Sequence, residues 1–338
     1  ITWSLVGSEM CIRDRSCRVT RGDFTESIHV AFAVIVDSEG QIIYSTGDPH
    51  YLTCIRSSLK PFQAAASVKI GAVDAAGFDE KELALMCASH KGEDIHVETA
   101  LSMINKLDLN IEDFECGSHY PSDTFTRHKM IRENEVATAL HNNCSGKHAG
   151  MLALAKYLEA ETKGYINKQH LVQKTILEYV AKLSGETDMF TETDGCSAPT
   201  PFMTLKTIAE LFQSLVSCKK PELKRVYDAM VAYPELVGGT NHFDSMFISA
   251  LDGRGVTKVG GESVRGISLN TEKYGPIGVS IKILDGSFRA MPLAVIKLME
   301  HLELLSEDEK NKLNKFKTKK LINHNGIQIG HIEAHVDF

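Results

Sequence analysis

A serine and a lysine that lie three residues apart form the first candidate for chemistry. Ser57 precedes Lys60 at the start of a predicted helix, and this spacing places both side chains on one helix face. A lysine whose pKa is lowered by burial or by another cation can take the serine proton, which makes the serine a nucleophile. An exposed serine at a helix start is the alternative. Arg56 and Pro61 beside the pair favour the catalytic interpretation.

A second serine and a second lysine follow further along the chain. Ser89 lies in CASHKGED (87–94), a loop after a predicted helix, and Lys258 lies in VTKVGG (256–261) on a predicted strand. Taken singly, Ser89 would be a capping or loop serine, and Lys258 would be a solvent-facing lysine on a strand. The order S-x-x-K, loop serine, then K-x-G on a strand before the last helix is typical of serine acyl-transfer enzymes of the penicillin-recognising type.

Two cysteines in polar, glycine-containing loops are candidates for binding a soft metal. Cys144 lies in NNCSGKHAG (142–150) and Cys196 lies in TDGCSAP (193–199). With His148 they form a possible zinc-binding set. Free cysteines are usually buried packing residues, which is the alternative interpretation. The polar setting of both loops favours the metal.

Strands at both ends of the chain and helices between them must position these residues. β-branched and apolar residues on either side of the turn DSEG (37–40) predict a hairpin from 29–36 and 41–45. Glycine-rich turns separate predicted strands at 255–261, 265–269 and 275–284. Apolar residues at helical spacing predict helices over 55–73, 81–87, 95–107, 146–160, 169–183, 202–216, 221–233 and 288–305. The basic stretch 310–320 is expected to be a solvated helix end or linker. This order predicts an α/β (α+β) fold whose sheet is built from N- and C-terminal strands around a helical middle.

Composition excludes several classes of protein. The chain of 338 residues has a net charge of −7, so it lacks the basic surface typical of nucleic-acid binding. No run reaches the ~18 apolar residues of a membrane-spanning helix. Eight cysteines without a C-x-x-C pair are too few for a disulfide scaffold, and they indicate a reducing, cytoplasmic location.

The first fifteen residues differ in character from the rest of the chain. ITWSLVGSEMCIRDR lacks the features of a secretory signal and resembles translated adapter sequence, so residues 1–15 are expected to be a non-native leader. A genuine N-terminal arm is the alternative. Residues 16–338 are expected to form one catalytic domain, helix-rich over about 76–236.

Seven motifs together resemble the L-asparaginase II family, the Rhizobium-type or class 3 asparaginases. The resemblance runs from about residue 18 to about residue 305, and NNCSGKHAGM is its most specific part. The fold of this family is similar to that of serine β-lactamases and glutaminases. The motifs are VTRGDFTESIH (19–29), IRSSLKPFQA (55–64), ASHKGE (88–93), HNNCSGKHAGML (141–152), TDGCSAPT (193–200), VGGTNHFDS (237–245) and VTKVGGESV (256–264).

The resemblance also implies roles for individual residues. It places the nucleophile on Ser57 with Lys60 as its helix partner, and a second serine–lysine pair on Ser89 and Lys258. It implies one zinc ion on Cys144, Lys147 and Cys196, so that Lys147 replaces His148 as the third ligand. A lysine ligates only when it is neutral. Substrate contacts are implied for Arg56, His148 and Asp194.

The activity implied by the resemblance is hydrolysis of L-asparagine to L-aspartate and ammonia through an acyl-serine. Zinc would help substrate binding, and the enzyme would be a cytoplasmic homodimer with no nucleic-acid or membrane partner. One alternative is another β-lactamase-fold serine hydrolase, such as a glutaminase or peptidase. Another is a non-catalytic amino-acid- or zinc-binding protein. A metal-dependent amidohydrolase is disfavoured because the chain has no H-x-H or H-E-x-x-H motif.

Overall fold

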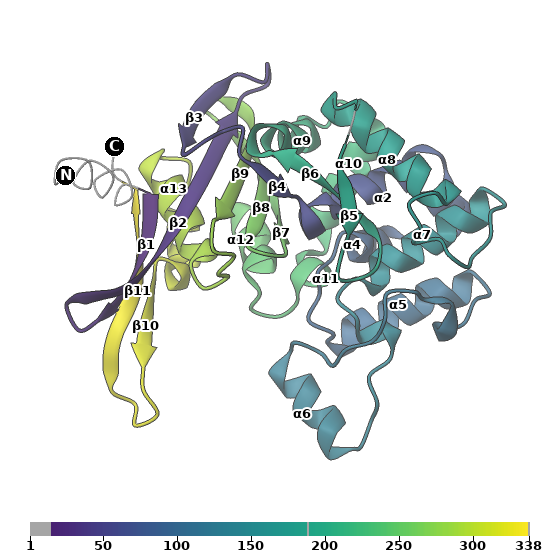
Figure 1. Ribbon diagram of the computed structural model, residues 1–338, viewed down its shortest axis with the longest axis horizontal. Helices are drawn as coiled ribbons and strands as arrows, with labels where there is room; N and C mark the ends of the chain where they lie inside the picture. Colours follow the sequence, from purple (N-terminus) through teal and green to yellow (C-terminus); the bar gives the residue numbers. More distant parts are fainter. Residues whose placement is uncertain (1–14, 188, 337–338) are drawn as a thin grey trace.

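The main sheet joins the two ends of the chain, as the order of predicted strands requires. The computed structural model describes residues 15–187 and 189–336. Within them, eight antiparallel strands run in the order β10-β11-β1-β2-β9-β8-β7, and β3 pairs with β2 (Figure 1). Their bounds are β1 Arg15–Arg21, β2 Phe24–Val36, β3 Ile42–Thr46, β7 Gly255–Gly260, β8 Val264–Thr271, β9 Gly275–Ile283, β10 Thr318–Ile322 and β11 Gln328–Val336.

Helices gather beside this sheet and cover both of its faces (Figure 1). A small second sheet, β4-β6-β5, lies near the site described below. The helices are α2 Lys60–Lys69, α3 Ala72–Ala75, α4 Glu80–Met86, α5 Asp94–Lys106, α6 Thr124–Arg132, α7 Ser145–Tyr157, α8 Leu171–Ser184, α9 Leu205–Ser217, α10 Pro221–Ala232, α11 Pro234–Gly238, α12 Phe243–Leu251, α13 Met291–His301 and α14 Glu307–Lys312. The short strands are β4 Leu52–Cys54, β5 Thr191–Thr193 and β6 Pro199–Thr204, and short 3-10 helices span η1 Arg56–Leu59, η2 Ile111–Asp113, η3 Ala139–His141 and η4 Asn314–Phe316.

The sheet separates two hydrophobic cores. Successive side chains of a strand point to opposite faces, so Val34 and Val36 of β2 pack with the helical part while Ile35 packs with α12 and α13. Helix α9 lies directly on β8 and β9. Gly266 and Gly278 permit this approach, since a Cβ on either residue would collide with α9. The helical part is thereby held against β8 and β9, and β8 pairs directly with β7, the strand that carries Lys258.

Most predicted elements are present, with differences at their ends. The 29–36/41–45 hairpin is β2 and β3, and the three later strands are β7, β8 and β9. The 55–73 segment is divided into η1, α2 and α3, with Pro61 in the first turn of α2. The helix expected over 202–216 begins at Leu205, because the preceding residues belong to β6.

The basic stretch 310–320 was expected to be a helix end or linker, and only its first part fits: residues 310–312 end α14. Its last residues form β10, which pairs with β11 at the edge of the main sheet. Lysines on an exposed edge strand discourage pairing with other chains, which explains why a strand there carries so much charge. The expected leader lies outside the described residues except for Arg15, which begins β1.

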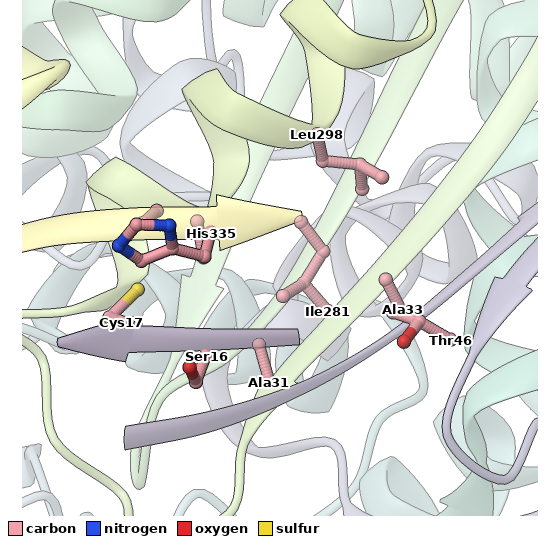
Figure 2. A pocket seen from close by; sticks show the side chains of 10 residues that line it. Ser16, Cys17, Ala31, Ala33, Thr46, Ile281, Leu298 and His335 are labelled. Atoms are coloured by element: carbon pink, nitrogen blue, oxygen red, sulfur yellow. The ribbon is translucent and has the colours of Figure 1, made fainter. Parts of the chain in front are cut away.

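The described part lacks a membrane-spanning helix, and one hollow in it is too small for a ligand. None of its helices has the length and apolar character needed to cross a bilayer. A hollow between β1, β2, β9, β11 and α13 measures only about 20 Å³ (Figure 2). This space suits at most one water molecule. The thiol of Cys17 in its wall is buried, which raises its pKa to about 12.

Candidate active site

A cavity of about 620 Å³ opens where η1, the start of α7 and the end of β7 meet. Six of the ten residues predicted from sequence line it: Arg56, Ser57, Ser89, Cys144, Asp194 and Cys196. The three predicted lysines are buried next to these lining residues and contact them. The fold therefore brings together residues that are separated by up to about two hundred positions in the sequence.

Two of the predicted lysines, Lys60 and Lys258, converge on one hydroxyl group. Lys60 donates to Ser89 Oγ at 3.1 Å and Lys258 donates to the same atom at 2.8 Å. Lys60 also donates to the carbonyls of Ala88 and Asn143, and Lys258 donates to that of Val259. The lysine side chains are almost completely buried, at 1% and 0% exposure. Ser89 is thus a bridge between two amines.

Lys258 has a pKa well below that of an ordinary lysine. Burial disfavours its ammonium form, and the positive charges of Lys60 and Arg265 add to this effect. Together they outweigh the attraction of Asp244, and the pKa of Lys258 falls to about 7. A substantial fraction of Lys258 is therefore neutral near pH 7, as a proton acceptor must be.

Ser57 and its neighbour Ser58 have different surroundings. The Ser57 side chain is half-buried at the cavity wall, and its hydroxyl has no hydrogen-bond partner within the described residues. Ser58 is fully buried, and its hydroxyl donates to the Lys258 carbonyl at 2.9 Å. Ser58 therefore fastens η1 to β7, which carries Lys258, and η1 leads directly into α2, which begins with Lys60. Sequence reasoning gave Ser58 no role, because S-x-x-K specifies only its outer residues.

Arg56 and Asp194 form a charged pair at the cavity wall. Arg56 Nε donates to Asp194 Oδ1 at 2.7 Å, and the side chains are 29% and 9% exposed. Arg56 has a φ of 51°, an uncommon left-handed conformation for a residue other than glycine. Such strain often accompanies functional sites. Gly261 leaves room for the guanidinium, since a Cβ there would lie 2.7 Å from Arg56 Cζ.

The two cysteines and Lys147 meet at one point. Lys147 Nζ lies 2.8 Å from Cys196 Sγ, and both cysteines are free thiols. A hydrogen bond from Cys196, with the charges of Lys60 and Lys147, lowers the pKa of Cys144. Burial by itself would lower the pKa of the Lys147 amine. The sulfurs of Cys196 and Cys144 outweigh the effect of burial, so the pKa of this amine is raised.

This donor set is chemically suited to zinc. Two sulfurs and one amine converge, and thiolates are preferred zinc ligands. Among the described residues, no group of three His, Cys, Asp or Glu side chains is arranged to hold a metal. A metal here would therefore need Lys147 as the third ligand, with its proton released on binding.

His148 lies behind the cavity rather than on its wall. Its side chain is fully buried, and Nδ1 is 2.8 Å from the Tyr165 hydroxyl. Nε2 has no hydrogen-bond partner in the part of the chain that the structure describes. Burial and the nearby Lys147 lower the pKa of His148 well below its usual value. The structure thus does not bring this predicted contact residue to the cavity surface.

Several lining side chains had no predicted role. Four of them belong to motifs quoted above, namely Asn142 and Asn143 in 141–152, His242 in 237–245 and Val259 in 256–264. Their presence in those motifs was the only available signal. The others are His119, Ser122 and Phe288.

Three solved structures with some likeness to the chain are distant from it in sequence. The Mglu protein crystallised in 4.3 M NaCl is 15% identical, with a TM-score of 0.36 over 81% of this chain and 61% of that chain. The chain thus spans less than two thirds of Mglu. A variant of the last common ancestor of Gram-negative class A β-lactamases is 11% identical, with a TM-score of 0.38 over 86% and 90%. A chromosome-encoded β-lactamase mutant of Vibrio parahaemolyticus is 10% identical, with a TM-score of 0.37 over 86% and 92%.

Family membership rests on sequence. No curated protein matches the chain. The profile of the L-asparaginase II family, in contrast, matches residues 17–334. This match covers nearly all of the described residues and every residue of the candidate site, and it supports a hydrolase that acts on amides. The chain belongs to the L-asparaginase II family.

Proposed function

We propose that the protein is an L-asparaginase that hydrolyses L-asparagine to L-aspartate and ammonia through an acyl-serine. The observation that carries this proposal is the convergence of Lys60 and Lys258 on Ser89, beside the cavity that Ser57 lines. A protein that only binds amino acids has no use for two buried lysines on one hydroxyl, because burying them costs folding energy.

Ser57 is the proposed nucleophile, and Ser89 is the proposed proton relay. The Ser57 hydroxyl is free to approach a substrate, whereas Ser89 is held between two amines. Ser57 Oγ attacks the side-chain amide carbon, and its proton passes through Ser89 to neutral Lys258. The same path returns a proton to the leaving nitrogen, so that ammonia departs and an aspartyl ester remains. Water then cleaves the ester and regenerates Ser57.

The tetrahedral intermediate needs a donor for its negative oxygen. The N–H of Ser58 already bonds to the Ile55 carbonyl. The N–H of Ser57 has no acceptor among the described residues, and it lies at the start of η1. This N–H is the proposed oxyanion donor, a type of contact whose loss typically costs ~10²–10³ in kcat.

Arg56 and Asp194 are proposed to hold the charged end of the substrate. One Asp194 oxygen accepts from Arg56 Nε, which leaves the second oxygen for an α-ammonium group and the outer guanidinium nitrogens for an α-carboxylate. Fixing that end at one place makes the position of the amide carbon depend on side-chain length. Glutamine, one methylene longer, would place its amide carbon out of line with Ser57.

Zinc is a further part of the proposal. Cys144, Lys147 and Cys196 would hold it, and it would supply a positive charge that orients a polar substrate group next to the serine. The attacking group remains Ser57. The homodimer and the cytoplasmic location stay predictions, which sedimentation and fractionation can test.

The test is ammonia release from purified protein given asparagine, glutamine or a chromogenic β-lactam. We expect turnover of asparagine, and mass spectrometry of a rapidly quenched reaction should find an aspartyl group on Ser57. Turnover of glutamine or of the β-lactam instead would favour the alternative serine hydrolases. No turnover, combined with tight binding of an amino acid, would favour the binding protein.

A further inference from the structure

A buried ion pair lies directly behind Lys258. Asp244 is in the first turn of α12 and Arg265 is on β8, while Lys258 is on the intervening strand β7. Arg265 Nη1 donates to Asp244 Oδ1 at 2.5 Å. Both side chains are buried, at 2% and 0% exposure. Charged residues are almost never buried to this extent unless they are paired.

The carboxylate of Asp244 is satisfied without Lys258. Arg265 occupies Oδ1, and the Val259 N–H donates to Oδ2 at 3.1 Å. Lys258 Nζ lies 3.8 Å from Oδ2, beyond hydrogen-bond distance but close enough for electrostatic attraction. The amine instead bonds to Ser89 at 2.8 Å.

Arg265 is itself held in place from two further sides. Its Nη1 donates to Thr257 Oγ1 at 2.8 Å, and Thr257 in turn donates to the Gly266 carbonyl. The guanidinium carbon lies 4.6 Å from the centre of the Phe243 ring, a favourable cation–π distance. Arg265 is therefore anchored by β7, β8 and α12 together, and it cannot swing away from Asp244 without breaking these contacts.

We propose that Arg265 and Asp244 are positioning residues of the serine–lysine centre, in which Arg265 keeps the Asp244 carboxylate from capturing Lys258. This inference rests on the proposed function, because it gives the pair its purpose. Without Arg265, Lys258 and His242 would be left beside a buried carboxylate, and burial lowers the pKa of His242, so that Lys258 would supply the positive charge. The amine would turn from Ser89 towards Asp244 and would stay protonated to a higher pH.

Titratable and charged groups act on Lys258 from several elements that pack around it. Asp244 favours its ammonium form, whereas Lys60 on α2 and Arg265 on β8 disfavour it. The remaining groups are Cys87 at the end of α4, Cys144 at the start of α7 and His242 at the start of α12. Only Asp244 and Arg265 form an ion pair whose members can be removed one at a time.

The two single variants should shift the pH profile in opposite directions. In Arg265→Gln the uncompensated carboxylate favours protonated Lys258, so the rising limb of kcat/KM with pH should move up by about 1 to 2 pH units. In Asp244→Asn the amine loses its attraction to the carboxylate while Arg265 still repels it. The limb should then move down by about 1 to 2 pH units.

Three further variants separate positioning from simple structural damage. Arg265→Lys keeps the positive charge, so its limb should stay near the wild-type position. The double variant of Asp244→Asn with Arg265→Gln leaves no unpaired buried charge, and its limb should lie between those of the singles. The control is Arg254→Gln, which breaks the Arg254–Glu309 pair (2.8 Å) elsewhere in the fold and should lower stability without moving the limb.

Lys258 can also be titrated without substrate. Its Nζ resonance in 15N-lysine-labelled protein is assigned by its loss in Lys258→Met, and its pH midpoint is then measured in each variant that remains folded by circular dichroism. Midpoints that move in opposite directions support the inference even if wild-type protein does not hydrolyse asparagine, an outcome that would reject only the proposed function. Midpoints and limbs that stay fixed, or that move in the same direction in both single variants, would overturn it.

Discussion

Gly261 offers a sharp test of how the substrate's charged end is held. Gly261→Ala would place a Cβ 2.7 Å from Arg56 Cζ, 2.8 Å from Nη2 and 3.0 Å from Nη1. Contacts this short do not persist, so the guanidinium must move by several tenths of an ångström. The Arg56 Nε to Asp194 Oδ1 bond of 2.7 Å would then lengthen or break.

The cost can be estimated from the bond and its exposure. A hydrogen bond to a charged group contributes about 1.5–3 kcal/mol, and the partial exposure of Arg56 places this one near the lower end. A loss of about 1–2 kcal/mol corresponds to an increase in KM for asparagine of about 5- to 30-fold. The value of kcat should fall less, because Ser57, Ser89 and both lysines keep their contacts. Thermal stability should change little, since the end of a flexible side chain can yield.

Gly195→Ala is the matched control. Its Cβ would lie 3.9 Å from Arg56 Nη2, an ordinary contact, in the same cavity and next to the same guanidinium. Steady-state kinetics of both variants on asparagine provide the comparison. Equal KM values for Gly261→Ala and the wild type would refute the assignment of Arg56 to the substrate's charged end. An equally raised KM in Gly195→Ala would show that any added methyl group disturbs the cavity, and it would remove the specific role of Arg56.

Four other outcomes follow from the site. Ser57→Ala should abolish turnover and lower stability by no more than about 1 kcal/mol, as judged by ammonia release and thermal melting; activity in both Ser57→Ala and Ser89→Ala would exclude an acyl-serine. The kcat/KM for asparagine should exceed that for glutamine by on the order of 100-fold at matched concentrations, because the longer side chain of glutamine misplaces the reacting carbon. Cys144→Ser should lower the zinc content measured by metal analysis and raise KM more than it lowers kcat; fully active metal-free protein would remove zinc from the proposal. The acidic limb of kcat/KM should have a midpoint close to the pKa of Lys258, about 7, and a flat profile between pH 6 and 8 would contradict its role as the base.

The sequence predicts elements and motifs better than it predicts contacts. Periodicity indicates most helices, and the hairpin at 29–36 and 41–45 is present as expected. It does not reveal β10, because an edge strand whose lysines face solvent has the composition of a linker. The order of Ser57, Lys60, Ser89 and Lys258 suggests a shared site. That both amines share Ser89 depends on three elements that only the fold brings together.

Buried charges were the part of the site least accessible from sequence. Asp244 and Arg265 have residue types that are normally exposed, so nothing in the chain marks them as buried. His148 shows a different gap between sequence and structure, because it lies only four residues after Cys144 yet does not point to the same place. The fold directs its ring to Tyr165 instead, and the short contact to Cys196 comes from Lys147.

Burial of Lys258, the proposed base, destabilises the fold in a pH-dependent way. The pKa of Lys258 is lowered from 10.5 to about 7 on folding, so between these values the unfolded chain binds a proton that the folded protein does not. Stability linked to this group therefore rises as pH increases from about 7 to about 10. Below pH 7 both states are protonated, and the full cost, on the order of several kcal/mol, is present. Lys258→Met should thus stabilise the protein near neutral pH and much less near pH 10, at the same time as it removes activity. Because burying Lys258 costs stability, the buried lysine is stronger support for the proposed catalysis than the S-x-x-K motif itself.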